Sequence, residues 1–233
     1  DAIMMAHPAF ANAESINTIA MDAYQIEFFG KPAHAAAAPH EGINALDAMI
    51  NFFNLVNAMR QETKPDARIH GIITDGGKAA NIIPDYTAAS FYIRANRVAD
   101  VKKLAERVRN CAAGAALGTG CTYKMEYNEE NFKDTVRNHV LNDLAADHIE
   151  AFTDEPLMRL DGIYIPGSSD MGDVSYEAPA IQMQFKIGEY PNPMGGAHTP
   201  EMAAARSLST WFRTVSLKFS SSNSILYVQP VSS

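Results

Sequence analysis

GKPAHAAAAPHEGINALDA, residues 30–48, is the segment around which the rest of the chain is organised. Gly30 follows the strand-like run Tyr24–Phe29, and the amphipathic run Ile43–Met59 has the 3.6-residue period of a helix. Between these runs, consecutive alanines follow His34, and their small side chains leave its imidazole accessible to a ligand or another subunit. His34 is therefore a candidate functional group, although this segment taken alone favours an ordinary polar loop histidine.

Working outward from this segment, strand and helix patterns alternate. Apolar alternation predicts strands, and 3.6-residue periods predict helices. The predicted strands are Ile19–Phe29, Ile69–Thr74, Tyr86–Ile93 and Thr122–Tyr127, and the predicted helices are Gly42–Arg60 and Val98–Ala116. The resulting order, β-α-β-β-α-β, is that of a ferredoxin-like sandwich, which we place at residues 18–131. The buried stripe of its first helix is expected to consist of Leu46, Met49, Ile50, Phe53 and Val56.

The remaining segments predict a second, α/β arrangement. Ala2–Ala6 reads as a short strand that Pro8 ends, which places His7 at a strand end, where functional residues of α/β sheets collect. A histidine bonded only to backbone is an equally good interpretation of His7. Downstream we expect a helix over Val136–Glu150, a strand around Tyr164, loops over Gly167–Ser175 and Gly188–Pro200, a strand over Ala180–Ile187 and a helix from Glu201. The predicted fold class is therefore α/β, with residues 1–17 and 132–233 in one domain that the sandwich interrupts.

Composition limits the class of protein. A chain of 233 residues with 47% hydrophobic and 20% charged residues is typical of a globular protein, and the net charge of -8 argues against a nucleic-acid partner. No apolar run approaches about 20 residues, so no membrane span is expected. Cys111 and Cys121 form neither a disulfide framework nor a zinc ribbon, which favours a cytoplasmic location. The chain begins within a strand pattern, without an initiator methionine or signal peptide, which indicates a fragment or a processed chain.

Three further loops carry side chains suited to anions or metals. Asn81 lies in GGKAANIIPD, and Arg94 ends the next strand; an amide and a guanidinium can hold an oxyanion and a carboxylate, although taken alone they favour a turn asparagine and a solvated arginine. GSSDMGDVS, residues 167–175, offers N–H groups and hydroxyls, including Ser168, or else a helix N-cap. His198 in GAHTPEM precedes a predicted helix and is placed to ligate zinc.

Taken together, these motifs resemble a known family of dinuclear metal-dependent amidohydrolases and carboxypeptidases, which includes carboxypeptidase G, aminoacylase and the aminobenzoyl-glutamate hydrolases. The motifs that carry the resemblance, in the family's order and spacing, are MMAHP, GKPAHAAAAPHEGINALDAM, GGKAANIIPD followed by IR, GSSDMGDVS and GAHTPEM. GSSDMGDVS is more similar to the aminobenzoyl-glutamate hydrolase branch. The resemblance implies a zinc-peptidase-like α/β catalytic domain with an inserted ferredoxin-like lid, through which the protein forms a homodimer.

The resemblance also implies roles for individual residues. His7 and His198 match metal ligands, His34 matches the lid histidine that reaches the partner subunit's active site, and Asn81 and Arg94 match substrate binders. His70, on a strand leading toward the Asn81 turn, and Ser168 are additional candidates for substrate contact. The implied reaction is hydrolysis of an amide bond in an N-acyl or aminobenzoyl amino acid or dipeptide-like substrate, by a hydroxide that bridges two zinc or manganese ions.

The sequence departs from the family pattern at both ends. The upstream metal ligands and the adjacent glutamates that supply the general base are not among its residues, and after Ala205 a serine-rich stretch replaces the expected alanine-rich helix. A non-catalytic dimerisation or ligand-binding fragment of the same family is therefore the rival interpretation. Zinc or manganese is expected to bind weakly, because two neutral imidazoles leave each ion mostly hydrated.

Overall fold

The computed structural model describes residues 2–9, 11–128 and 131–186, which belong to two compact units. Unit 2 is the continuous segment Ile19–Asp134. Unit 1 combines Asp1–Thr18 with Thr135–Ser233, so its two parts lie on either side of unit 2 in the sequence. The predicted loop over Gly188–Pro200 and the predicted helix from Glu201 lie outside the described residues.

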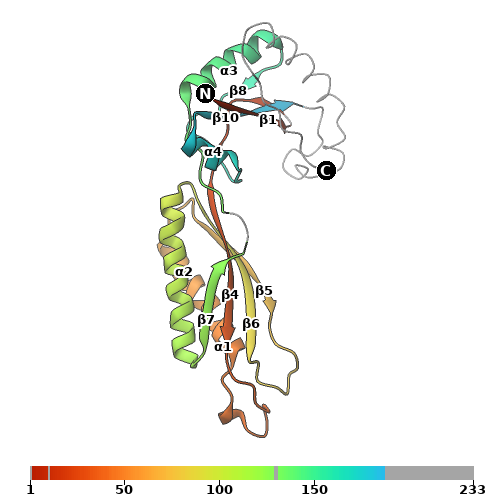
Figure 1. Ribbon diagram of the computed structural model, residues 1–233, viewed down its shortest axis with the longest axis vertical. Helices are drawn as coiled ribbons and strands as arrows, with labels where there is room; N and C mark the ends of the chain where they lie inside the picture. The colour runs from red at the N-terminus through yellow and green to blue at the C-terminus, as the bar shows by residue number, and fades with distance from the viewer. Residues whose placement is uncertain (1, 10, 129–130, 187–233) are drawn as a thin grey trace. The chain divides into compact units, whose positions relative to one another are not determined.

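Unit 2 is a four-stranded antiparallel sheet with two helices on one face (Figure 1). Its elements, in chain order, are β4 (Ala20–Phe29), α1 (Ala45–Met59), β5 (Arg68–Asp75), β6 (Tyr86–Ala95), α2 (Val98–Thr119) and β7 (Thr122–Tyr127), with single 3-10 turns at Pro39–Glu41 and Arg60–Glu62. The strands lie in the order β5-β6-β4-β7, so β5 and β7 are the edges. The predicted α/β class with a ferredoxin-like β-α-β-β-α-β unit is confirmed.

The core of unit 2 lies between the sheet and the two helices. Alternate residues of β4 and β6 point toward the helices, so Phe28 and Phe91 pack against Phe52 of α1 at ring-centroid distances of 5.9 and 5.2 Å. The stripe predicted for α1 is wrong in part, because Ile50 is exposed and Phe52 is fully buried. The Asn44 side chain accepts from Leu46 N–H and caps the helix, whose buried side consists of small alanines together with Met49, Phe52 and Val56.

The other face of the same sheet is not covered by either helix. Its side chains come from the alternate positions of each strand, and they include polar and aromatic residues of β5 and β6. On β6 these are Tyr86, Ala88, Ser90, Tyr92 and Arg94. We refer to this side below as the open face. Residues that lie opposite one another in the strand register share this open face. Some of the candidate site residues described below lie on it.

Unit 1 contains a small mixed sheet in the order β1-β10-β2-β8 and a separate parallel pair, β3-β9. The bounds are β1 (Ile3–Ala9), β2 (Asn12–Ala13), β3 (Asn17–Thr18), α3 (His139–Phe152), β8 (Leu157–Met158), β9 (Tyr164–Ile165), α4 (Met171–Glu177) and β10 (Ala180–Lys186). Ile181 and Met183 of β10 are buried in a cluster with Ala145 and Ile149 of α3. The predicted strand over the β10 region and the predicted helix over the α3 region are confirmed.

Two local predictions for unit 1 are wrong. Pro8 does not end the first strand, which continues to Ala9. Among the described strands β1 pairs only with β10, and an edge strand tolerates a residue without an N–H on its unpaired side. The segment Gly167–Ser175 is not entirely a loop, because α4 begins at Met171.

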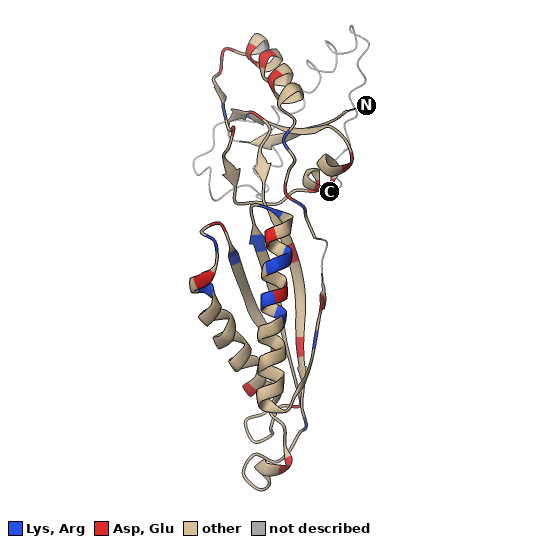
Figure 2. Cartoon of the chain, turned by 90° about the vertical axis from the view of Figure 1, so that its left-hand side faces the viewer, with Lys and Arg blue, Asp and Glu red and all other residues tan. Residues whose placement is uncertain are grey.

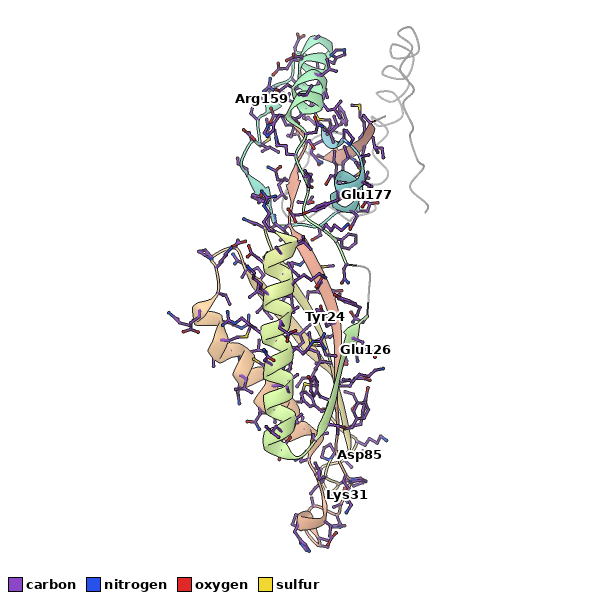
Figure 3. The ribbon with its side chains drawn as sticks, turned by 60° about the vertical axis from the view of Figure 1, so that its left-hand side comes forward. Tyr24, Lys31, Asp85, Glu126, Arg159 and Glu177 are labelled. Carbon is purple, nitrogen blue, oxygen red and sulfur yellow. The ribbon has the colours of Figure 1, made fainter. Side chains whose placement is uncertain are left out.

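A buried ion cluster ties the β2–β3 segment to the rest of unit 1. The Glu14 carboxylate is 4% exposed and accepts from Arg137 Nη2 at 2.6 Å, Arg159 Nη1 at 2.9 Å and Leu160 N–H at 3.1 Å. Burial raises the pKa of Glu14, but these hydrogen bonds outweigh burial and leave its pKa below the ordinary value of 4.5. The charged carboxylate therefore contributes to the stability of this unit. Arg159, labelled in Figure 3, also pairs with Glu150 of α3 at 2.8 Å.

Within the described ranges, no helix is both long and apolar enough to cross a membrane.

Candidate functional site

Backbone pairing closes the His34 loop at its base. The N–H of Lys31 donates to the Ile43 carbonyl at 2.8 Å, and the N–H of Ile43 donates back at 2.9 Å. Gly30 is required here, because a Cβ would lie 2.1 Å from the Ile43 carbonyl oxygen. The N–H of Gly30 also donates to the Asp85 carbonyl at 2.8 Å, and Figure 3 shows Lys31 and Asp85 at the same end of unit 2. The loop is therefore closed on itself and anchored to the connection between β5 and β6.

The His34 imidazole is held in one tautomer by its own loop. Its Nδ1 accepts from the N–H groups of Ala37 at 3.1 Å and Ala36 at 3.3 Å. Because Nδ1 accepts, the proton of the neutral ring must be on Nε2. The side chain is exposed, so Nε2–H is a donor available to a group outside this loop.

Asn81 lies directly beside the His34 loop. The N–H of Ala35 donates to the Asn81 carbonyl at 2.9 Å, and the N–H of Ile83 donates to the Ala33 carbonyl at 2.9 Å. These bonds make His34 and Ile82 an antiparallel bridge pair. Both residues are exposed, so the His34 imidazole and the Asn81 amide are accessible at the same end of unit 2.

Arg94 lies apart from the His34 loop, on the open face together with His70 and Tyr92. His70 and Tyr92 are opposite one another in the β5–β6 register, with ring centroids 5.6 Å apart and planes at 90°. The Arg94 Cζ lies 5.7 Å from the Tyr92 ring centroid, and burial lowers the pKa of the half-buried guanidinium without neutralising it. Burial also lowers the pKa of His70 below its ordinary value of 6.5, and the charges of Arg94 and Arg60 lower it further. A charged guanidinium beside a neutral imidazole can bind one carboxylate.

Asn81 and Arg94 are not brought together within one chain. Arg94 pairs with Met21 at the start of β4, whereas Tyr86 pairs with Phe29 at its end, beside the Asn81 turn. The eight residue steps from Tyr86 to Arg94 span roughly 25 Å at about 3.3 Å per residue. His34 and Asn81 therefore form one cluster, and His70 and Arg94 form another at the opposite end of the sheet.

His7 and Ser168 belong to unit 1. The His7 side chain is exposed, and its Nδ1 lies 2.8 Å from the Pro8 carbonyl, so Nδ1 must donate and Nε2 keeps its lone pair. This is the opposite tautomer to His34. Ser168 is half-buried and precedes α4. Its neighbour Ser169 donates to Gln182 Oε1 at 2.8 Å and accepts from the N–H of Met171, which fixes this segment against β10.

One of the described residues suits a divalent metal ion. His7 presents an unprotonated Nε2 with its Nδ1–H held by a carbonyl, the arrangement that metal-ligating histidines adopt. In the described part of the chain, no group of three or more His, Cys, Asp or Glu side chains is placed to hold an ion. The predicted second ligand, His198, lies outside it. His7 therefore fits one ligand position, and a complete ligand set requires residues beyond those described.

Tyr92 is a further candidate, which the sequence motifs do not indicate. It precedes Arg94 by two residues, so both side chains lie on the open face. That spacing was readable in the sequence, but the position of His70 across the β5–β6 pair was not. The strand register places His70 opposite Tyr92, and the side-chain positions show that the Tyr92 ring contacts both candidates.

Comparison with known proteins identifies the sheet unit. Residues 20–119 match the family model of the peptidase dimerisation domain. The chain is 34% identical over 193 residues to Xaa-Arg dipeptidase from Mus musculus, covering 81% of this chain and 44% of that protein. It is also 34% identical over 131 residues to a p-aminobenzoyl-glutamate hydrolase component from Escherichia coli (strain K12), covering 55% of this chain and 27% of that protein. The chain thus spans less than half the length of these relatives.

Solved structures share the fold. The aminobenzoyl-glutamate utilization protein from Klebsiella pneumoniae superposes with a TM-score of 0.66 at 18% identity, over 79% of this chain and 50% of that one. A hydantoinase/carbamoylase family amidase from Burkholderia vietnamiensis superposes with a TM-score of 0.67 at 16% identity, over 92% and 54%. The family predicted from the motifs is confirmed. This chain carries the peptidase dimerisation domain and belongs to the amidohydrolase and peptidase family that includes these hydrolases.

Proposed function

We propose that this chain is part of an enzyme that hydrolyses an amide bond in an N-acyl or aminobenzoyl amino acid or a dipeptide-like substrate, with zinc or manganese as cofactor. The names of its relatives, a dipeptidase and an aminobenzoyl-glutamate hydrolase, support amide hydrolysis in general. Unit 1 would supply part of the catalytic α/β domain, and unit 2 would serve as the lid and dimerisation domain. A bound divalent metal would polarise the scissile carbonyl and activate water.

The observation that carries this proposal is the tautomer of His34. Amide hydrolysis develops negative charge on the carbonyl oxygen, and a fixed N–H donor aimed at that oxygen lowers the barrier. Two backbone N–H groups occupy Nδ1, so the exposed Nε2–H is such a donor before any substrate arrives. Asn81 lies beside it and can add an amide N–H.

The separation of the two clusters supports a site shared between subunits. A small acyl amino acid cannot reach both the Asn81 turn and Arg94, because the length of β6 from Tyr86 to Arg94, roughly 25 Å, separates them. In the proposed dimer, His34 and Asn81 of one subunit would serve the site that holds the partner's catalytic residues. Arg94 and His70 would hold the substrate carboxylate in the site of their own subunit.

A surface suited to this dimer is present on unit 2. The edge strand β5 carries Ile72 and Ile73, which are 66% and 42% exposed. The neighbouring helix α1 carries a single charged residue, Asp47, and is almost entirely tan in Figure 2. An unpaired strand edge beside a helix surface poor in charge is typical of a two-fold interface.

The proposal is tested with the full-length protein, loaded with zinc or manganese. Release of the amino acid from p-aminobenzoyl-glutamate and from an Xaa-Arg dipeptide is measured by chromatography. Hydrolysis of at least one substrate that is lost with chelator and with His34→Ala is expected. A dimer that binds these compounds without hydrolysing any of them would support the rival interpretation, a binding or dimerisation protein.

A further inference from the structure

The Tyr92 ring contacts two groups that the proposed function uses. Arg94 Cζ is 5.7 Å from the ring centroid, within the distance of a cation–π contact. The His70 ring, on the neighbouring strand, lies at 5.6 Å and at 90° to the Tyr92 plane. Both contacts are on the open face, where the sheet has no helix above it.

These contacts restrict the Arg94 side chain, which would otherwise lose much conformational entropy when it binds a carboxylate. An arginine loses much rotamer freedom when its guanidinium is fixed on a carboxylate. A ring that already holds the guanidinium plane reduces the part of this cost that falls on binding. The perpendicular His70 ring restricts rotation of Tyr92 in turn, so the platform is itself held by the neighbouring strand.

We propose that Tyr92 is a positioning residue, whose ring orients the Arg94 guanidinium for the carboxylate of an N-acyl amino acid. The inference rests on the proposed function, in which Arg94 holds that carboxylate. Tyr92 acts through Arg94, with no contact to the scissile bond required of it. The ring face makes the contact with the guanidinium, so the proposed role requires the ring.

Another tyrosine on the same strand provides a matched control. Tyr86 lies on the same face of β6, but its hydroxyl donates to Glu27 Oε1 at 2.6 Å and its ring packs against Phe29 at 5.5 Å. It is six residues from Tyr92, or roughly 20 Å along the strand. Tyr86→Leu removes an aromatic ring from the same sheet without touching Arg94.

The experiment uses the full 233-residue chain and hippurate, N-benzoylglycine, as the carboxylate probe. Calorimetry measures hippurate affinity, and ¹⁵N relaxation of the Arg94 Nε–H measures the order of its side chain. Tyr92→Leu should weaken hippurate binding about fivefold and disorder Arg94, the size expected for a lost half-exposed cation–π contact. Tyr92→Phe should restore both to within about twofold, since it keeps the ring face. Tyr86→Leu should match the wild type in both measurements.

Several outcomes would overturn the inference. One is a Tyr92→Leu variant that binds hippurate as tightly as the wild type. Another is a Tyr86→Leu variant that binds hippurate as weakly as Tyr92→Leu does. If Tyr92→Leu does not fold, the wild type decides, because Arg94 protons over the ring face must be shifted upfield by its ring current. Hippurate binding that requires Arg94 and Tyr92, without hydrolysis in the full-length protein, would overturn the proposed reaction and leave this inference intact. A wild-type chain that does not bind hippurate would overturn this inference, whereas the proposed reaction is decided by the hydrolysis assay of the full-length protein.

Discussion

Asn81 and Arg94 lie at opposite ends of the same antiparallel sheet, although only one strand separates them in sequence. The turn that contains Asn81 meets the His34 loop, where the Ala35 N–H donates to the Asn81 carbonyl at 2.9 Å. Arg94 instead pairs with Met21, at the other end of β4. Since a small substrate spans far less than the roughly 25 Å between these ends, the two residues would contact one substrate only from different subunits.

His34→Ala in the full-length enzyme should lower turnover by roughly 10²–10³, the usual effect of losing one oxyanion donor. Folding and metal content should be nearly unchanged, because the exposed ring fills no core. His40→Ala is the matched control, since His40 lies in the same loop and its side chain is 77% exposed. Initial rates at saturating substrate distinguish the two variants, and equal losses in both would argue against an oxyanion role for His34.

Mixing defective subunits tests whether His34 acts across the dimer. A His34→Ala subunit paired with a His7→Ala subunit would contain one complete site, because the second subunit lends its intact His34 to the first. Activity should rise toward half of the wild-type value for a dimer with one of two sites restored. Co-expressed, doubly tagged heterodimers are assayed against both parents. Activity no higher than that of the parents would mean that His34 serves its own subunit.

Ile72→Lys should convert the proposed dimer to a monomer. Ile72 lies on the unpaired edge strand β5, and a lysine there is the device by which natural sheets block edge pairing. Leu117→Lys on α2 is the control, because Leu117 is 86% exposed and lies on a different element. Sedimentation velocity at micromolar concentration measures the outcome. A wild-type monomer, or an Ile72→Lys dimer, would exclude β5 as the interface.

Gly30→Ala should lower the free energy of unfolding by about 2–3 kcal/mol, the upper part of the range for overpacking. The added Cβ would lie 2.1 Å from the Ile43 carbonyl oxygen, where only backbone movement makes room. Gly118→Ala in α2 meets nothing within 4 Å and should instead stabilise by about 0.5 kcal/mol, as alanine does in helices. Urea denaturation compares the two. A tolerated Gly30→Ala would show that the base of the His34 loop is not closed as described.

Glu14→Gln should lower the free energy of unfolding at pH 7 by about 3 kcal/mol, because it breaks a buried ion cluster. The pKa of Glu14 is below its unfolded value of about 4.5, so its contribution is complete above that pH. The contribution is lost as the pH falls through the folded pKa, and the variant and wild type should then converge. Glu155→Gln should change the free energy of unfolding little at either pH, because the Glu155 side chain is 50% exposed in its ion pair. A pH-independent difference for Glu14→Gln would contradict this assignment.

The sequence by itself determined the order of elements in unit 2, because periods of 2 and 3.6 residues are local properties of the chain. It also indicated that His34 and Asn81 lie in loops, since short runs of alanine and glycine separate them from the apolar segments. The family followed from motifs in their order. His198 lies outside the described residues, and its role stays a prediction.

Only the tertiary structure decided which of these residues meet. The neighbours of His34 and Arg94 depend on strand register, which joins residues far apart in sequence, such as Ala35 with Asn81. The opposite tautomers of His34 and His7 depend on whether backbone N–H groups or a carbonyl lie beside Nδ1. The exposure of Ile50 depends on which side of α1 packs against the sheet. The continuation of β1 through Pro8 depends on which edge of β1 is paired. Local patterns do not carry this information, because the free energy that selects each arrangement comes from contacts between distant segments.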